Sequence, residues 1–351
     1  MSSRWNIYHG VVHVHTEASG GEPLEAIIEH AKDAGLDFVV ITDHNTRHCD
    51  APVDAWHDGV LILCGEEVIC HDGHMLAFET REDIGQQPSA EIAIEEIRRQ
   101  VGVVAGCHYQ LDIPHRPHRI PRPLSMSDVD IVEIWSFTDE FLTRVHPSKV
   151  LQYQARPDRV IVGPPRPVVK RWDIELEKRP VSAIGSLNAH NRKEPLLDWK
   201  EFVPFEYSFH TIRTAVITPR LPKSFPRARD LVWQALRRGN AFIYNRAISP
   251  VPSFSFRFEG PENEGCQMGE TSQFVANGRM HISIPQPAEI VLRHNSLPAF
   301  WTTAQDLSFP ALGPGVYRVE VWLEGRLWIL SNAIRLMATE EVRQPTVSDF
   351  T

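Results

Sequence analysis

Short apolar runs that end in histidine or a carboxylate recur along this chain of 351 residues. Imidazole nitrogens and carboxylate oxygens are ligands that divalent transition metals prefer. Because these donors are spread over residues 13–190, they meet only if the strands lie side by side, which predicts a multi-metal centre at the rim of a barrel. The motifs are His13-Val14-His15, Thr42-Asp43-His44, Gly65-Glu66-Glu67, Gly73-His74-Met75-Leu76, His108 and Asn188-Ala189-His190.

The composition narrows the class of protein. Hydrophobic residues make up 42% and charged residues 23% of the chain, as in an ordinary globular protein. The formal net charge of −9 argues against a nucleic-acid partner. We expect no membrane span, because no run of about eighteen apolar residues occurs. The five cysteines are odd in number and lack CxxC spacing, which predicts reduced thiols in a cytoplasmic protein.

The first part of the chain alternates between helix-like and strand-like segments. Residues 24–31 have helical apolar spacing, and Gly35 can end that helix in a left-handed conformation. The run Phe38–Ile41 is continuously apolar, which is typical of a strand buried on both faces. The alternation predicts βα units in a barrel or a doubly wound sheet. Further strands are predicted at 60–64, 103–105, 129–135, 160–162 and 183–187, and further helices at 92–101 and 227–238.

The pattern changes after residue 248. Phe254, Phe256 and Phe258 alternate strictly, and strand-like runs follow at 289–294, 316–323 and 327–336. We therefore predict two domains, residues 1–248 and a small antiparallel β-sandwich in residues 249–351. The second domain could be structural, a substrate wall or a dimer surface.

The motifs resemble those of the PHP family, named for polymerase and histidinol phosphatase. Residues 12–16 resemble its HxHT motif, 42–45 its TDH motif, 65–77 its GxE and HLLA pair, and 185–190 its GSDAH motif. The resemblance covers residues 8–245. It implies a distorted seven-stranded βα (TIM-like) barrel that binds two or three divalent metals (manganese, zinc or iron). It also implies a phosphoesterase that hydrolyses a small, anionic phosphate ester by attack of a metal-bound hydroxide.

The rear of the chain is similar to the PHP branch that contains carbaryl hydrolase. The similarity lies in residues 314–321 and 330–334. It implies an alternative activity, hydrolysis of carboxyl or carbamate esters on the same metals. A third interpretation is a catalytically degenerate metal-binding protein, suggested by Asn188 and Gly20, which stand where the family usually has Asp.

On this resemblance, His13 and His15 bind the first metal. Glu67 bridges two metals, because a carboxylate has two oxygens. His74 and His108 complete the second metal. The neighbouring Glu66 is expected to point away and form a structural ion pair.

His44 and His190 resemble the ligands of a third metal. If that metal is absent, they are the candidate catalytic residues, donating a proton or holding a substrate oxygen. Asp43 is expected to orient a ligand. Asn188 binds metal through an uncharged oxygen, so the first site should be weaker, and Glu17 could replace a missing acidic ligand. We therefore expect two metals, with the third site vacant or weak.

Other charged residues have open roles. Glu133 is either an orienting carboxylate or part of a plain ion pair. Lys170, Arg171 and Lys193 either hold an anionic substrate or belong to the solvated surface. The Pro- and Arg-rich segment 114–123 is either a flap over the substrate or a connector.

Overall fold

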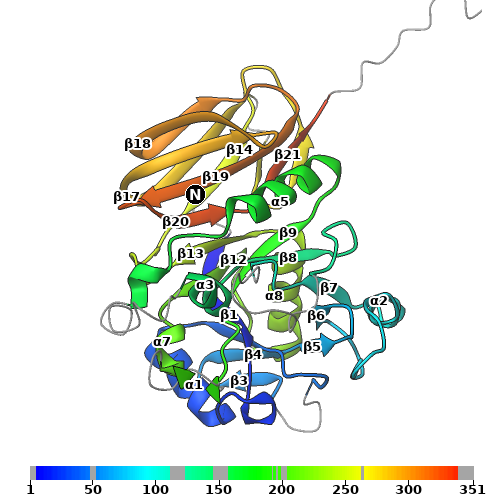
Figure 1. The fold of residues 1–351 in the computed structure, drawn as a ribbon. Coiled ribbons are helices and arrows are strands. Elements are labelled where there is room, and N and C mark those ends of the chain that lie inside the picture. The colour runs from blue at the N-terminus through cyan, green and yellow to red at the C-terminus, as the bar shows by residue number, and fades with distance from the viewer. Residues whose placement is uncertain are drawn as a thin grey trace, which may run out of the picture.

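The computed structural model describes most of the chain and has the predicted mixed α/β class (Figure 1). Among these residues, the strands lie in one sheet of fourteen strands, one of five and one of two. No described helix is long and apolar enough to cross a membrane. The described residues are 5–47, 53–110, 123–144, 157–191, 193–194, 197–198, 204–261 and 265–338.

The large sheet begins with parallel strands from the first part of the chain. β1 (Asn6–Val14) pairs with β2 (Phe38–Ile41), which pairs with β4 (Val60–Cys64). β3 (Ala55–His57) adds an antiparallel edge to β4. Every residue of β2 and β4 is buried, as continuous apolar runs require. The predictions for 38–41 and 60–64 are confirmed.

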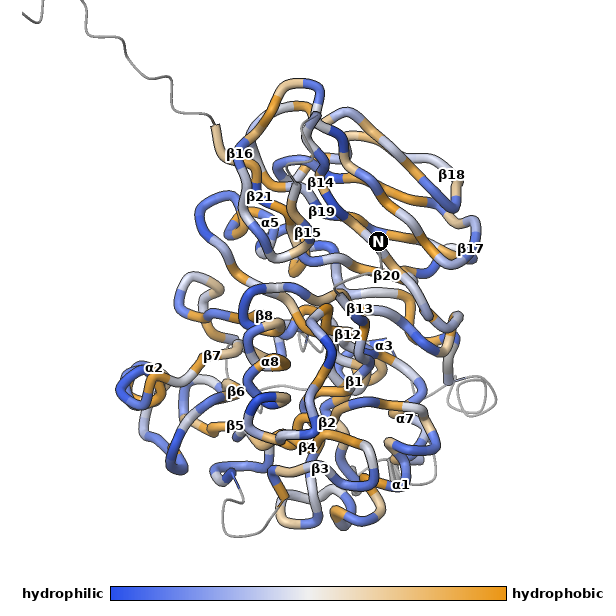
Figure 2. Tube along the Cα trace, turned by 180° about the vertical axis from the view of Figure 1, so that it is seen from behind, coloured by the Kyte–Doolittle hydropathy of each residue, from blue (hydrophilic) through white to orange (hydrophobic). Residues whose placement is uncertain are grey.

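Helices close these units where the sequence predicts. α1 (Leu24–Asp33) buries Ile27 and Ala31 on one face, and Gly35 follows it with a φ of 66°. A left-handed conformation at this point is the ordinary role of glycine after a helix. α2 (Ala90–Arg99) carries hydrophilic and hydrophobic colours on different sides, as an amphipathic helix should (Figure 2). The short helix η1 (Glu17–Ser19) precedes α1.

The five-stranded sheet carries the next part of the chain. Its strands, in order, are β5 (Glu66–Ile69), β6 (His74–Phe78), β7 (Val103–Gly106), β8 (Ile131–Ser136) and β9 (Ser182–Ser186). The first three pair antiparallel and the last three parallel. α3 (Phe137–Arg144) follows β8 directly, and α5 (Arg166–Lys178) precedes β9.

The predicted strand at 160–162 is wrong. A short 3-10 helix, η3 (Pro157–Val160), occupies its start. The backbone N–H groups of Val162 and Gly163 donate to the Glu140 carboxylate at 2.9 Å, so a side chain takes the place of a neighbouring strand. Apolar residues alone could not show that partner.

The large sheet continues with two antiparallel strands. β12 (Ile212–Thr218) pairs with β1, and β13 (Ala241–Asn245) pairs with β12. Between them α8 (Phe225–Arg238) ends at Gly239, which has a φ of 79°, as predicted for 227–238. Short elements complete this region: β10 (Lys193–Glu194), β11 (Leu197–Asp198) and α7 (Phe205–Ser208).

The two main sheets meet through backbone hydrogen bonds at their ends. The Glu67 N–H donates to the carbonyl of Asp43 at 3.0 Å, and the Ala189 N–H donates to the carbonyl of His13 at 3.2 Å. The ends of β1, β2, β5 and β9 therefore come together. Because the hydrogen-bond ladders divide into two sheets, the single seven-stranded barrel stays a prediction.

The C-terminal strands extend the large sheet. β20 (Arg326–Ser331) pairs with β13, so the C-terminal strands belong to the fourteen-stranded sheet, and a separate antiparallel β-sandwich stays a prediction. Phe254, Phe256 and Phe258 are all buried, which confirms the strict alternation. The boundary between 248 and 249 stays a prediction. The strands are β14 (Ser255–Glu259), β15 (Gly265–Gln267), β16 (Thr271–Gln273), β17 (Arg279–His294), β18 (Leu297–Pro310), β19 (Gly315–Leu323), β20 (Arg326–Ser331) and β21 (Ile334–Met337).

A buried ion-pair network ties α5 to these strands. The Arg318 side chain on β19 is 2% exposed and pairs with Asp173 of α5 and, at 2.7 Å, with Glu320. Arg293 also contacts Glu320 at 2.7 Å. Burial raises the pKa of Glu320, but the charges of Arg318 and Arg293 outweigh burial and lower it. The network holds α5 against the sheet.

We expect Arg318→Met to destabilise the protein by about 3–5 kcal/mol, because it leaves the buried Asp173 carboxylate without its cation and Glu320 with Arg293 alone. The measurement is urea unfolding followed by circular dichroism. Arg257→Met is the matched control, since Arg257 pairs with Glu259 on the exposed surface and should cost about 1 kcal/mol or less. Equal losses in both variants would contradict the prediction.

Candidate metal centre

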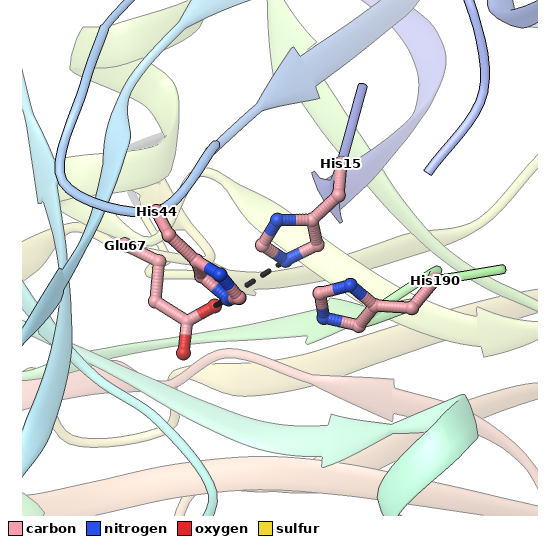
Figure 3. A group of neighbouring side chains, drawn as sticks. All are labelled: His15, His44, Glu67 and His190. Carbon is pink, nitrogen blue, oxygen red and sulfur yellow. Dashed lines mark ion pairs between the residues drawn. The ribbon is translucent and has the colours of Figure 1, made fainter. Parts of the chain in front are cut away.

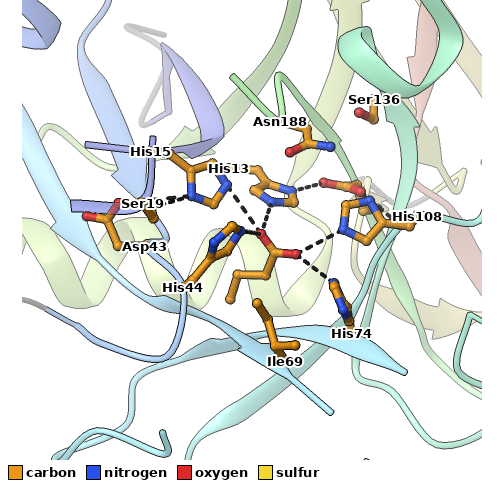
Figure 4. Close-up of polar contacts among 12 residues, drawn as sticks. His13, His15, Ser19, Asp43, His44, Ile69, His74, His108, Ser136 and Asn188 are labelled. Carbon is orange, nitrogen blue, oxygen red and sulfur yellow. Dashed lines mark hydrogen bonds and ion pairs between the residues drawn. The ribbon is translucent and has the colours of Figure 1, made fainter. Parts of the chain in front are cut away.

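The centre is organised around the carboxylate of Glu67 on β5. Glu67 is 2% exposed, and five imidazoles lie against its two oxygens (Figure 4). Oε2 lies 3.1 Å from His13 Nε2, 3.3 Å from His15 Nε2 and 3.1 Å from His44 Nε2, and Oε1 lies 3.0 Å from His74 Nδ1 and 3.1 Å from His108 Nε2. One carboxylate thus joins two sets of nitrogen donors.

β1 delivers the first two histidines through a local irregularity. The pairing of β1 with β2 shifts between Val12 and Val14, so His13 sits in a bulge with a φ of 64°. His13 and His15 both face Glu67, as expected, but the bulge interrupts the simple alternation used to predict it.

Three residues of the centre have left-handed backbone. Besides His13, His108 has a φ of 60° and Asn188 a φ of 49°. Such conformations cost non-glycine residues about 1–3 kcal/mol and gather at functional sites. The surrounding fold therefore holds these side chains in place at a cost.

The donor atoms fall into groups that share Glu67. One group contains His15, His44, Glu67 and His190, with all ligand atoms within 4.8 Å of one another (Figure 3). His190 also stacks on His15, with ring centroids 3.8 Å apart. This grouping places His15 with His44 and His190 rather than with His13.

A second group contains His13, Glu67 and His108 within the same 4.8 Å limit. His74 contacts Glu67 from the same side as His108. A third group of donors, Cys107, His108 and Glu133, overlaps the second. The structure thus brings together predicted ligands that lie in or directly beside six strands: β1, β2, β5, β6, β7 and β9.

Carboxylates stand behind the buried imidazoles. Glu133 Oε1 lies 2.6 Å from His13 Nδ1, and Asp139 Oδ2 lies 3.2 Å from His108 Nδ1. A carboxylate accepts, so each Nδ1 carries a proton, and Nε2 is the nitrogen that could present a lone pair to a cation at the centre. This arrangement orients histidine ligands of metals. It favours the orienting role for Glu133 over a plain ion pair.

A carboxylate also orients His15, but it acts through the hydroxyl group of Ser19. The Ser19 hydroxyl donates to Asp43, so its oxygen accepts the hydrogen bond from His15 Nδ1 at 2.9 Å. Asp43 also accepts hydrogen bonds from the backbone and hydroxyl of Thr16 at 2.8 and 2.7 Å. The expected orienting role of Asp43 therefore acts through Ser19.

The lone pair of His15 Nε2 faces another hydrogen-bond acceptor, a carboxylate oxygen of Glu67. His15 Nε2 is buried without a hydrogen-bond partner among the described residues, and the nearest carboxylate oxygen, Glu67 Oε2, lies 3.3 Å away. Two acceptors at this distance repel, and a cation between them removes the conflict. The residues present fit a divalent metal.

Protons balance the charges when no metal is bound. Burial lowers the pKa of His13, but Glu133 and Glu67 outweigh burial and raise it to about 9. Burial also opposes the charge on His108, yet its neighbours Cys107 and Asp139 hold the pKa of His108 well above its usual value. Burial lowers the pKa of His15 to about 4.

Glu67 stays ionised in the same surroundings. Burial raises the pKa of Glu67, but hydrogen bonds from the histidines, His108 and His13 foremost, hold it well below its usual value. The metal-free centre therefore pairs an anionic carboxylate with protonated imidazoles.

Some expectations need correction. Glu66 forms none of the ion pairs found among the described residues, contrary to expectation. Its buried carboxylate accepts backbone hydrogen bonds from Ile84 at 2.8 Å and Gly85 at 2.7 Å. Glu17 is exposed and belongs to none of the donor groups, so it does not replace the missing ligand; Ser19 lies beside His15 instead.

The basic residues expected to hold an anionic substrate belong to none of the described donor groups. Lys170 and Arg171 are exposed, and the Arg171 guanidinium lies 5.8 Å from the ring centroid of Tyr109. The Lys193 side chain and residues 111–122 lie outside the described part of the chain.

Sequence reasoning missed two residues, Ser19 and Asp139. Asp139 lies in the first turn of α3, a helix that the sequence analysis did not predict. No motif contains it, and only its contact with His108 reveals its role.

No family model matches the chain. The uncharacterised protein MJ1587 of Methanocaldococcus jannaschii is 30% identical over 111 residues, which is 28% of this chain and 65% of that protein. The chain thus spans less than two thirds of that relative.

One solved structure is similar over most of the chain. It is a two-domain protein from Bacteroides vulgatus that contains a predicted PHP-like metal-dependent phosphoesterase. It is 13% identical, with 94% of this chain and 96% of that chain covered and a TM-score of 0.45. Neither match supports the branch that contains carbaryl hydrolase.

We expect metal uptake to release about two protons per chain at pH 7, because His13 and His108 must lose theirs to bind a cation. Affinity should rise with pH up to about 9, where His13 is neutral without metal. In the metal-free protein the charged His13 stabilises the fold fully below pH 6.5, and this stability is lost as the pH rises through about 9. Calorimetric titration with Mn²⁺ in buffers of different ionisation enthalpy measures the protons. A heat independent of the buffer would contradict the prediction.

We expect Glu133→Gln to weaken Mn²⁺ binding about 10–100-fold, since an amide no longer stabilises the His13 tautomer that faces the metal. Equilibrium dialysis measures the affinity. Glu29→Gln, which removes the same charge from the exposed face of α1, is the control and should bind as tightly as the wild type. Unchanged affinity in Glu133→Gln would show that this carboxylate does not orient a ligand.

Proposed function

We propose that this chain is a metal-dependent phosphoesterase of the PHP type that holds two divalent cations on either side of Glu67. The observation that carries the proposal is the position of Glu67 between two groups of imidazoles: Oε2 faces His15 and His44, and Oε1 faces His74 and His108. His13 lies 3.1 Å from Oε2 and belongs to the same donor group as His108. The resemblance of the sequence motifs to the PHP family supports the same conclusion.

The number of carboxylates near the donor groups supports two cations rather than three. The carboxylates of Glu67, Glu133, Asp139 and Asp43 lie in or directly behind the donor groups. Four negative charges balance two divalent cations, and a third would leave two positive charges buried. His15, His44 and His190 would hold one cation, and His13, His108 and His74 the other.

When bound, such cations activate water as a nucleophile and neutralise charge on the ester that is attacked. The protein's own residues supply the rest. Glu133, Asp139 and the Ser19–Asp43 pair keep the imidazoles in one tautomer and one orientation. Preformed geometry of this kind lowers the cost of reaching the transition state.

Two partly exposed histidines, His44 and His74, mark the side on which the centre faces solvent. The side chains of His44 and His74 are 17% and 22% exposed, whereas those of His13 and His15 are fully buried. A small anionic ester therefore reaches the centre past His44 and His74. Because His44 would hold a cation here, its expected role in donating a proton or holding a substrate oxygen would apply only if that cation were absent.

Paired cations suit phosphoryl transfer, because they stabilise both the attacking and leaving oxygens of an in-line displacement.

The four described cysteines are free and buried, which supports a cytoplasmic location.

A substrate panel tests the activity. Protein purified with Mn²⁺ is assayed with an aryl phosphate monoester, a phosphate diester, an aryl carboxyl ester and an aryl carbamate. Metal analysis is run on the same sample. Turnover of a phosphate ester with two metal equivalents supports the proposal. Turnover of only carboxyl esters or carbamates would show the alternative hydrolase, and bound metal without any turnover would show a degenerate metal-binding protein.

We expect Glu67→Gln to lose bound metal and to lower hydrolysis by at least about 100-fold, because no anionic bridge remains between the cations. The neighbouring Glu66→Gln is the matched control. It changes a carboxylate that accepts only backbone hydrogen bonds and should keep both metal and activity. A Glu67→Gln protein with the wild-type metal content would rule out the bridge.

A further inference from the structure

We propose that Asp139 and Asn188 work as one unit, in which Asp139 turns the amide oxygen of Asn188 toward the metal centre. Asp139 is then a positioning residue for two ligands, Asn188 and His108. The inference rests on the metal centre of the proposed function and adds to it a residue outside every motif.

The amide of Asn188 has one satisfied end and one unsatisfied end. Its Nδ2 donates to Asp139 Oδ1 at 2.9 Å, whereas its Oδ1 is buried without a hydrogen-bond partner among the described residues. A buried acceptor without a partner costs about 1–3 kcal/mol. Asn188 also has left-handed backbone, with a φ of 49°. Two costs at one residue indicate a role other than stability.

The chemistry of Asp139 fixes which way the amide points. A carboxylate only accepts hydrogen bonds, so the NH₂ end of Asn188 must face Asp139 and the oxygen must face away. The direction of the oxygen therefore follows from the partner, even though the two ends of an amide have nearly the same shape.

The oxygen lies on the side of the metal ligands. Backbone hydrogen bonds from Leu187 to Val12, at 2.9 Å, and from Ala189 to His13, at 3.2 Å, place Asn188 beside β1. Figure 4 shows Asn188 next to His13, with its oxygen on the His13 side of the amide. An uncharged amide oxygen in this position can bind a divalent cation.

The other oxygen of Asp139 serves His108. Oδ2 lies 3.2 Å from His108 Nδ1 while Oδ1 accepts from Asn188, so one carboxylate orients two ligands at once. Asp139 is fully buried at the start of α3, directly after β8. The negative charge missing at position 188 therefore lies one hydrogen bond further out.

Exchange of the two side chains should preserve the unit. In Asp139→Asn alone, the new NH₂ group faces the NH₂ of Asn188, so Asn188 must turn and direct N–H groups at the cation. In Asn188→Asp alone, two carboxylates face each other at the 2.9 Å that now separates Asn188 from Asp139, and we expect their repulsion to outweigh the charge that the new ligand adds. In the double variant, the amide at 139 accepts from His108 and donates to the carboxylate at 188, so both hydrogen bonds return.

The test measures Mn²⁺ affinity and stoichiometry by calorimetric titration of four proteins: wild type, Asp139→Asn, Asn188→Asp and the double variant. We expect each single variant to bind about 10–100-fold more weakly and the double variant to return to within a few-fold of the wild type. Asp33→Asn, an exposed change of the same kind on α1, should leave the affinity unchanged. Thermal unfolding of the metal-free proteins confirms that each is folded.

The outcomes separate the two proposals. A wild type that binds no metal overturns the proposed function. A wild type that binds metal together with an Asp139→Asn variant of equal affinity overturns the inference alone. If the loss of Mn²⁺ affinity in the double variant equals the combined losses of the two single variants, the two residues do not act as one unit. If Asp139→Asn fails to fold, recovery of affinity from Asn188→Asp to the double variant decides the question.

Discussion

The rest of this structure depends on one carboxylate, that of Glu67, held between imidazoles on both of its oxygens. The imidazoles come from β1, from the ends of β2 and β7, and from β6, so both main sheets must be formed before the contacts exist. Backbone hydrogen bonds between the sheets lie beside the same residues, since Glu67 donates to Asp43 and Ala189 donates to His13. The centre and the joint between the sheets are therefore one region.

Charge in this region is arranged in layers. Glu67 lies among the imidazoles, and Glu133, Asp139 and Asp43 lie behind them. Without a cation, the raised pKa values of His13 and His108 show that protons supply the missing positive charge. The fold is thus prepared for positive charge at a defined place, and the carboxylates behind His13 and His108 orient these rings as they orient histidine ligands of metals.

The sequence predicted those parts in which a local pattern has one physical cause. The runs 38–41 and 60–64 were recognisable because strands buried on both faces are continuously apolar, and α1 and α8 because glycine ends them. The histidine motifs were recognisable because metal donors follow strand ends. Ser19 and Asp139 were not, because each acts through a single long-range contact. The pairing of β13 with β20 is hidden for the same reason, and it joins the C-terminal strands to the large sheet.

The pairing of β13 with β20 also limits how the chain could have evolved by the joining of separate parts. Phe242 and Tyr244 of β13 are buried among the apolar side chains of the C-terminal strands, in one cluster with Phe256 and Trp328. A chain that ended before those strands would expose an unpaired edge and this apolar face to water, a combination that favours aggregation. The C-terminal strands are consequently not an interchangeable accessory: a recombination event at residue 248 would have to bring a replacement sheet with a matching edge.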